Sequence, residues 1–186
     1  MKDLLKLPDN LPIPVDDGAC NHLVGSRLPP LSLPATSGQT VDLGALRGTT
    51  VIYFYPMTGR PDSPPMIGWN EIPGARGCTP QNCGFRDHYT ELMRITAGVF
   101  GVSAQGLEEQ KETKQRLGLP FELLNDSNFL LTEALHLPTF EYDGVSLIKR
   151  LAIISVDGII QKVFYPVFPP DRNAEDVIEW LKNESA

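Results

Sequence analysis

The sequence predicts one α/β domain built on a mixed central β-sheet with helices on both faces. A nearly continuous β-branched and aromatic run over residues 49–55 predicts a central strand that is buried on both faces. Strand-like and helix-like segments alternate after it, which favours strands joined by helices. The dipeptide Asp157-Gly158 lies between two apolar runs and predicts a hairpin that adds an antiparallel edge. With 186 residues and no internal boundary, we expect a single domain over residues 1–186.

Two proline-rich segments interrupt this pattern. Residues 1–24 contain Pro8, Pro12 and Pro14 without a clear period, so we expect an N-terminal arm packed on the surface. Residues 57–74 carry four prolines and cannot form a regular element, because proline breaks both helices and ladders. We expect a long loop there, and loops of that length in compact domains are usually functional or mobile.

The first long helix is predicted to follow this loop. Phe85, Tyr89, Leu92 and Met93 lie at i, i+4, i+7 and i+8 and would form one apolar face. The Thr-Pro pair at 79–80 is a start signal, since threonine can cap a helix and proline suits its first turn. The other elements are expected in this order: short strands at 31–33 and 41–43, a buried strand at 98–103, a charged helix at 107–117, a strand at 121–124, a helix at 129–135, hairpin strands at 151–156 and 159–165, and a closing helix at 171–183.

Composition argues against several function classes. The formal net charge of −7 disfavours a general binder of nucleic acid or of anionic membranes. No apolar run approaches the roughly 18 residues that span a bilayer. Residues 1–8 lack the long apolar core of a signal peptide, so we expect a cytoplasmic protein. Three cysteines are too few and too unevenly spaced for a secreted disulfide framework, so a close pair indicates metal or redox chemistry.

The pair Cys78 and Cys83 lies where the loop enters the predicted helix. A helix N-terminus offers unpaired backbone N–H groups and a partial positive charge. Arg76 lies two residues before Cys78 and adds a full charge. Because only the thiolate of cysteine is nucleophilic, this setting predicts a reactive Cys78.

Helix geometry limits what the pair can do. Residues five apart in an intact helix have Cα atoms about 8.6 Å apart, whereas a disulfide needs roughly 7 Å or less. The two cysteines can therefore bond only if the first turns unwind. Cys78, Cys83 and His88 would also spread around the helix, which weakens a metal site, and we expect no metal. Thiol chemistry with peroxide is favoured over structural thiols or metal binding.

The stretch Gly77-Cys78-Thr79-Pro80-Gln81-Asn82-Cys83-Gly84-Phe85-Arg86-Asp87 resembles the active-site signature of atypical two-cysteine peroxiredoxins of the peroxiredoxin Q, or bacterioferritin-comigratory-protein, type. The motif at 53–56 and the segments at 101–103, 119–126 and 157–158 match in order. The resemblance implies a thioredoxin-like fold and a thiol peroxidase without metal or organic cofactor. It also implies that Cys78 is the peroxidatic cysteine and Cys83 the resolving one. A thioredoxin-like donor would reduce the Cys78–Cys83 disulfide, in a monomer or weak homodimer.

The chain departs from the family pattern before Cys78. The family proline and the family threonine or serine would fall on Glu71 and Ala75, so we infer an insertion after Pro56, within residues 57–74. The hydroxyl that would hydrogen-bond the peroxide is then missing at Ala75. Thr58 could substitute for it, or backbone N–H groups and Arg76 could take its part. This motivates a second hypothesis, a redox-sensing or interaction protein with weak peroxidase turnover.

The family arginine that stabilises the thiolate falls on Lys149 by counting and on Arg150 by residue type. These two would point to opposite faces of a strand. We assign the role to Arg150, because its fork of donors suits two oxygens of a peroxide. The rest of the substrate pocket is predicted to be Tyr55, Pro56, Ala75, Arg76, Gly77 and Thr79. Cys20 and the histidines at 22 and 88 are interpreted as non-catalytic.

Overall fold

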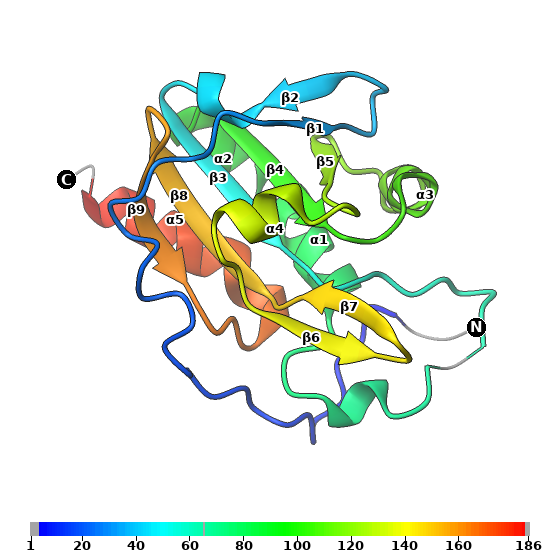
Figure 1. Cartoon of the computed structure of the whole chain (residues 1–186). Helices are drawn as coiled ribbons and strands as arrows, with labels where there is room; N and C mark the ends of the chain where they lie inside the picture. The colour runs from blue at the N-terminus through cyan, green and yellow to red at the C-terminus, as the bar shows by residue number, and fades with distance from the viewer. Residues whose placement is uncertain (1–3, 65, 185–186) are drawn as a thin grey trace.

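A five-stranded mixed sheet forms the centre of the computed structural model, which describes residues 4–64 and 66–184 (Figure 1). Strands β3, β4 and β5 are parallel, whereas β8 pairs antiparallel with β3 and β9 antiparallel with β8. This confirms the predicted α/β class and the antiparallel edge. The strand order is β5 (Glu122–Asn125), β4 (Gly98–Ser103), β3 (Thr49–Phe54), β8 (Leu151–Val156) and β9 (Ile159–Phe164).

Strand β3 is central because both of its faces are apolar. Val51, Tyr53 and the following Tyr55 contribute to a core with helices α1 (Cys78–Asp87), α2 (Tyr89–Ile95) and α5 (Asn173–Glu184). Ile52 and Phe54 contribute to a second core on the other face, which α4 (Leu130–Ala134) and the N-terminal segment cover. The sheet is therefore covered on both faces, as predicted.

The predicted first helix is divided in two at His88. His88 ends α1 and begins α2, with ψ near 4° instead of a helical value. Phe85 and Leu92 are fully buried as expected, but Met93 is 38% exposed. The prediction of one continuous apolar face was wrong at Met93, because the break at His88 changes the direction of the chain. The start signal was also misread: Gly77 is the N-cap, and Thr79 lies inside the first turn.

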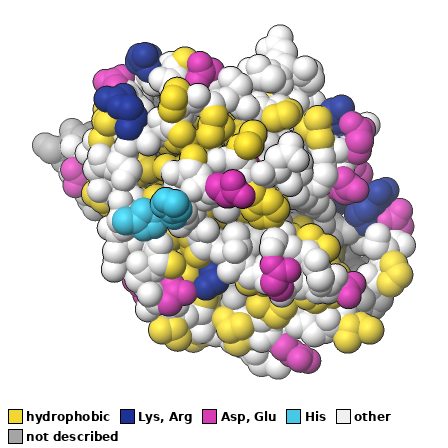
Figure 2. Space-filling model, viewed as in Figure 1, with side chains coloured by type: hydrophobic (Ala, Val, Ile, Leu, Met, Phe, Trp, Pro, Cys, Tyr) yellow, Lys and Arg dark blue, Asp and Glu magenta, His cyan; other side chains and the backbone are white. Residues whose placement is uncertain are grey.

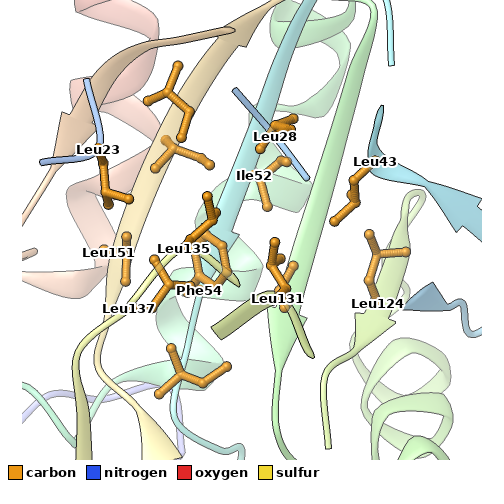
Figure 3. Close-up of a cluster of buried hydrophobic side chains, with 14 of the residues drawn as sticks. Leu23, Leu28, Leu43, Ile52, Phe54, Leu124, Leu131, Leu135, Leu137 and Leu151 are labelled. Atoms are coloured by element: carbon orange, nitrogen blue, oxygen red, sulfur yellow. The ribbon is translucent and has the colours of Figure 1, made fainter. Parts of the chain in front are cut away.

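The N-terminal arm is more than a surface segment. Leu23 is fully buried and Cys20 is 5% exposed, so both belong to the second core. Figure 3 shows Leu23 together with Leu151, Ile52 and Phe54 of the sheet and with Leu131 and Leu135 from the α4 region. Just after the arm, the backbone N–H groups of Gly25 and Leu28 bond to the carbonyls of Ile160 in β9 and of Gly158 in the turn before it. The arm therefore contributes side chains to the core, which the irregular sequence pattern did not indicate.

Several small elements complete the fold. Helix α3 (Leu107–Leu117) ends at Gly118 as predicted. The hairpin turn at Asp157-Gly158 has positive φ angles of 49° and 78°, as a two-residue turn requires. The hairpin of β6 and β7 was missed, although Asp143-Gly144 forms its turn. The remaining elements are β1 (Ser32–Pro34), β2 (Thr40–Asp42), η1 (Leu43–Ala45), η2 (Trp69–Glu71), β6 (Thr139–Tyr142), β7 (Val145–Ile148) and η3 (Pro170–Arg172).

The 57–74 segment packs on the missed hairpin. Trp69 of η2 is 3% exposed and meets Tyr142 edge-on, with ring centroids 4.9 Å apart. The ring of Phe140 lies 6.0 Å from Trp69, and the Tyr142 hydroxyl donates to the carbonyl of Ile67 at 3.0 Å. These contacts anchor the segment to the hairpin, beside the start of α1.

Candidate active site

Cys78 is the first residue of α1 and is 3% exposed. The preceding Gly77 has a φ of 111°, in the left-handed region that favours glycine. A Cβ on Gly77 would lie 2.2 Å from Cγ of Pro170 in η3. Gly77 thus lets the chain turn into α1 under η3, and places the Cys78 thiol at the positive end of the helix.

Gly77→Ala should lower the free energy of unfolding by roughly 2–4 kcal/mol, from backbone strain plus the clash with Pro170. Gly118→Ala is the matched control. Gly118 also has a positive φ, of 63°, but its Cβ would meet nothing within 4 Å, so only the backbone cost of about 1 kcal/mol remains. Urea denaturation followed by circular dichroism measures both. Equal losses in the two variants would show that the Pro170 contact costs nothing.

The guanidinium of Arg150 lies against the Cys78 thiol. Arg150 Nη2 is 3.3 Å from Cys78 Sγ and donates to the carbonyl oxygens of Ala75 at 2.9 Å and Arg76 at 3.2 Å. Lys149 points elsewhere: its Nζ is 2.9 Å from Asp17 Oδ2 and 3.4 Å from the Tyr165 hydroxyl. Of the two candidates, the structure thus brings Arg150 to Cys78, whereas the Lys149 side chain contacts Asp17 of the N-terminal arm.

Arg150 is 3% exposed, and the contacts described for it are to neutral groups and to the thiol. Burying a cation is costly unless an anion or several acceptors compensate it. A thiolate at Cys78 would supply that anion at hydrogen-bonding distance, and charge-assisted hydrogen bonds are stronger than neutral ones. The arrangement therefore places a buried cation and a helix N-terminus next to the Cys78 sulfur, where negative charge would develop in a reaction.

Gln81 and Asn173 hold Arg150 from the other side, and sequence reasoning missed both. Gln81 is 1% exposed; its Oε1 accepts from Arg150 Nη1, and its Nε2 donates to Asn173 Oδ1 at 2.9 Å. Asn173 thereby keeps the amide oxygen of Gln81 turned toward the guanidinium. The i, i+3 spacing from Cys78 to Gln81 was an available signal, because such residues share a helix face. Nothing in the sequence pointed to Asn173.

Asn82 ties the first turn of α1 to the central strand. The Tyr53 hydroxyl donates to Asn82 Oδ1 at 2.7 Å, and Asn82 Nδ2 donates to the Cys78 carbonyl at 2.8 Å. Burial raises the pKa of Tyr53 well above its usual value, so the hydroxyl remains a donor. The Tyr53 ring also stacks on Phe85, with centroids 4.1 Å apart. The sequence analysis assigned no role to Asn82.

Three other predicted pocket residues lie at the end of β3 and in the first turn of α1. Tyr55 is fully buried, and burial raises its pKa above the usual range, so it stays protonated. The Pro56 carbonyl accepts from Ser103 Oγ at 2.8 Å, which fixes the end of the strand segment. Thr79 is 5% exposed and follows Cys78 in the first turn.

Two other predicted groups are directed elsewhere. The guanidinium of Arg76 donates through Nη2 to the Lys6 carbonyl at 3.2 Å, toward the N-terminal arm. The Thr58 hydroxyl lies 2.6 Å from the Thr113 hydroxyl and donates to Gln105 Oε1 at 3.2 Å. Thr58 is therefore engaged with α3 and the loop before it. Ala75 is fully buried and brings its carbonyl to the site, but it has no hydroxyl.

Cys83 and Cys78 are both free thiols within one continuous helix. Cys83 is 6% exposed, and burial raises its pKa, an effect that the nearby Arg86 partly offsets. Cys20 is also buried, and burial raises its pKa to about 12. Both thiols are therefore protonated near neutral pH while the protein is folded and reduced.

We expect iodoacetamide to modify Cys20 and Cys83 at least roughly tenfold more slowly than a free thiol near neutral pH, because few of these molecules are thiolates. Peptide mapping by mass spectrometry measures each site separately. The same protein in urea is the control, where all three cysteines should react at similar rates. Rapid labelling of Cys20 in the folded protein would contradict the burial argument.

His22 and His88 make their contacts away from Cys78 and Arg150. His88 Nδ1 is 3.5 Å from Glu91 Oε2, and His22 Nε2 lies 2.8 Å from the Leu135 carbonyl. Within residues 4–64 and 66–184, no three His, Cys, Asp or Glu side chains gather in a way that could hold a metal ion. None of the helices in the described part of the chain combines the length and apolar character needed to cross a bilayer.

The family model and the most similar known proteins point to the same family. The Redoxin family model matches residues 23–178. The chain is 28% identical over 160 residues to the chloroplastic peroxiredoxin Q of Sedum lineare, covering 86% of this chain and 77% of that protein. It is 29% identical over 162 residues to the putative peroxiredoxin bcp of Coxiella burnetii, covering 83% and 95% respectively.

Solved structures agree on the fold. A peroxiredoxin Q from Xylella fastidiosa superposes with a TM-score of 0.68 at 20% identity, covering 95% of this chain and 98% of that one. The peroxidoxin BcpB of Mycobacterium tuberculosis gives 0.67 at 21% identity, covering 86% and 96%. These similarities confirm the thioredoxin-like fold that the sequence signature implied. With most of its length matched by the family model, the chain belongs to the redoxin family, as a peroxiredoxin of the peroxiredoxin Q and bacterioferritin-comigratory-protein type.

Proposed function

We propose that the chain reduces hydrogen peroxide and organic hydroperoxides, with Cys78 as the peroxidatic and Cys83 as the resolving cysteine. The observation that carries the proposal is the 3.3 Å contact between Arg150 Nη2 and Cys78 Sγ at the N-terminus of α1. A buried guanidinium and a helix end both stabilise negative charge on sulfur. The same charges stabilise the oxygen that leaves when the peroxide bond breaks.

The chemistry proceeds in two steps. The Cys78 thiolate attacks the terminal oxygen of ROOH, the O–O bond breaks, and the leaving RO⁻ takes up a proton as ROH. Cys78 becomes a sulfenic acid, oxidised by two electrons. After the first turns of α1 unwind, the Cys83 thiol condenses with it, and one water and the Cys78–Cys83 disulfide form. Unwinding is required because the two residues are five apart in one helix.

A dithiol donor must then return the enzyme to its reduced state. We propose a thioredoxin-like protein, whose thiolate attacks the disulfide and leaves as the oxidised partner. No step uses a metal or an organic cofactor. We further propose a cytoplasmic monomer or weak homodimer that binds neither nucleic acid nor membrane, in keeping with the net charge of −7.

Peroxide treatment followed by intact-mass measurement tests this function. One equivalent of hydrogen peroxide should lower the mass by about 2 Da as the disulfide forms. Cys83→Ser should consume one equivalent and accumulate sulfenic acid, whereas Cys78→Ser should consume none. Cys20→Ser is the control and should behave as the parent protein, since Cys20 is a buried thiol of the second core. Parent-like consumption by Cys78→Ser would refute the assignment.

Ala75 supports a second candidate, a redox-sensing or interaction protein with weak peroxidase turnover. The site lacks a side-chain hydroxyl at Ala75, and the Thr58 hydroxyl is engaged with Thr113 and Gln105. Each missing donor of an oxyanion site costs roughly 100- to 1000-fold in rate. Oxidation of Cys78 no faster than a free thiol, together with stable binding of a partner protein, would favour this candidate over the peroxidase.

A further inference from the structure

Two of the three histidines lie side by side on the surface, although they are far apart in the sequence. His22 belongs to the N-terminal arm, and His136 follows the end of α4. Their ring centroids are 6.3 Å apart, and both residues are exposed. Figure 2 shows two neighbouring histidine side chains on the surface, in cyan. Such a pair is a candidate metal site, because imidazole is the commonest side-chain ligand of transition metals.

The hydrophobic core holds the two backbones in place. Leu23, which follows His22, is fully buried. Leu135 and Leu137, on either side of His136, are 5% and 6% exposed. All three leucines belong to the second core, where Figure 3 shows them together. Because these neighbours anchor both segments in one core, the fold sets the spacing of the two imidazoles before any ligand binds.

A hydrogen bond from the partner segment orients the ring of His22. Its Nε2 is 2.8 Å from the carbonyl oxygen of Leu135. A carbonyl can only accept, so Nε2 carries the proton, and Nδ1 has the lone pair in the neutral ring. Metal-binding histidines commonly donate their other ring N–H to a backbone carbonyl, which fixes the tautomer and the ring orientation. His22 therefore has the hydrogen bond that a metal ligand needs, from the residue next to His136.

The spacing of the rings suits one small ion. A metal at about 2.0–2.1 Å from one nitrogen of each ring holds the two centroids roughly 5–6.4 Å apart, depending on the angle at the metal. The observed 6.3 Å lies at the wide end of that range, so a small rotation of the exposed rings would close the pair on one ion. Within residues 4–64 and 66–184, no third His, Cys, Asp or Glu side chain completes a metal cluster. Water would fill the remaining positions.

We propose that His22 and His136 bind a divalent transition metal of the nickel, copper and zinc class. Two nitrogen ligands without a carboxylate exclude Mg²⁺ and Ca²⁺, which prefer oxygen. A bound ion joins the N-terminal arm to the segment after α4, and so holds the arm on the core. The site involves neither Cys78 nor Arg150 and does not depend on the proposed peroxidase function.

Calorimetric titration of the untagged, reduced chain with nickel chloride tests the site. The parent protein should bind one ion per chain. His22→Gln and His136→Asn should each weaken binding at least roughly tenfold, because loss of an outer hydrogen bond to a ligand alone costs about 10- to 100-fold. Asparagine suits position 136, where φ is 49°, because it tolerates the left-handed region. Glutamine at position 22 retains an N–H that can reach the Leu135 carbonyl.

His88→Gln is the matched control. It removes the third histidine, which lies against Glu91, and should bind nickel as the parent does. Binding that survives in both His22→Gln and His136→Asn would show that thiols or other groups hold the ion, and would overturn the proposal. Equal binding of magnesium chloride, or no binding of nickel by the parent protein, would overturn it as well.

Unfolding in urea gives a second readout. Saturating nickel should raise the urea midpoint of the parent and of His88→Gln, because a ligand that binds only the folded state stabilises it. The midpoints of His22→Gln and His136→Asn should not change when nickel is added at the same concentration. A nickel effect of parental size in either of these variants would contradict a site that needs both imidazoles.

Discussion

Arg150→Met should lower the rate constant for oxidation of Cys78 by hydrogen peroxide by roughly 100- to 1000-fold, the cost of removing one preorganised donor from a developing oxyanion. The guanidinium is 3% exposed and 3.3 Å from Cys78 Sγ, so its charge acts in a poorly solvated site. Methionine keeps much of the volume and removes both the charge and the donors. Stopped-flow measurement of Cys78 oxidation at several hydrogen peroxide concentrations gives this rate constant directly.

Lys149→Met is the matched control for that experiment. Lys149 adjoins Arg150 in sequence, yet its ammonium bonds to Asp17 and Tyr165 and not to the thiol. We expect the rate constant with hydrogen peroxide to change by less than about threefold, because a partly exposed ion pair contributes little free energy. Arg150→Lys should recover only part of the loss, because an ammonium cannot reproduce the forked contacts to Ala75 and Gln81. A larger loss in Lys149→Met than in Arg150→Met would reverse the assignment.

Local patterns predicted most of the sheet and helices. The apolar run that forms β3, the Asp157-Gly158 turn and the Gly118 helix end each carry their signal in adjacent residues. The break at His88 carries none, since no glycine or proline marks it and the apolar period continues past it. The β6–β7 hairpin was missed because its strands are only four residues long and β6 has no fully buried residue, although Asp143-Gly144 is a turn signal.

The site was predictable where the chemistry lies in one stretch. Cys78 and its helix N-terminus follow from contiguous residues. Residue type favoured Arg150 over Lys149, but adjacent residues of an extended chain face opposite ways, and no local pattern shows which of the two faces the site. The hydrogen bond from Gln81 to Asn173 joins residues 92 apart and depends on the docking of α5 against α1. Tertiary packing decides such contacts, and no local period encodes them.

Tyr53→Phe should speed formation of the Cys78–Cys83 disulfide roughly tenfold. The Tyr53 hydroxyl anchors Asn82 to the central strand, and Asn82 in turn holds the Cys78 carbonyl. Both bonds stabilise the folded first turn, and neither geometry survives once that turn unwinds. Removing the hydroxyl leaves Asn82 Oδ1 buried without its donor, a loss of about 1–3 kcal/mol in the folded helix alone. The barrier to unwinding should fall, and resolution should accelerate.

Faster resolution should also protect Cys78 from a second peroxide. Sulfenic acid that persists is oxidised to sulfinic acid, so the peroxide concentration that inactivates half of the protein should rise in Tyr53→Phe. Tyr142→Phe is the control, because it removes a tyrosine hydrogen bond to Ile67 that lies outside α1. Rapid acid quench and mass spectrometry measure the disulfide and sulfinic forms together. If disulfide formation in Tyr53→Phe matched the parent rate, release of Asn82 would not limit resolution, and the barrier would lie in the α1 contacts with Pro170 and Asn173.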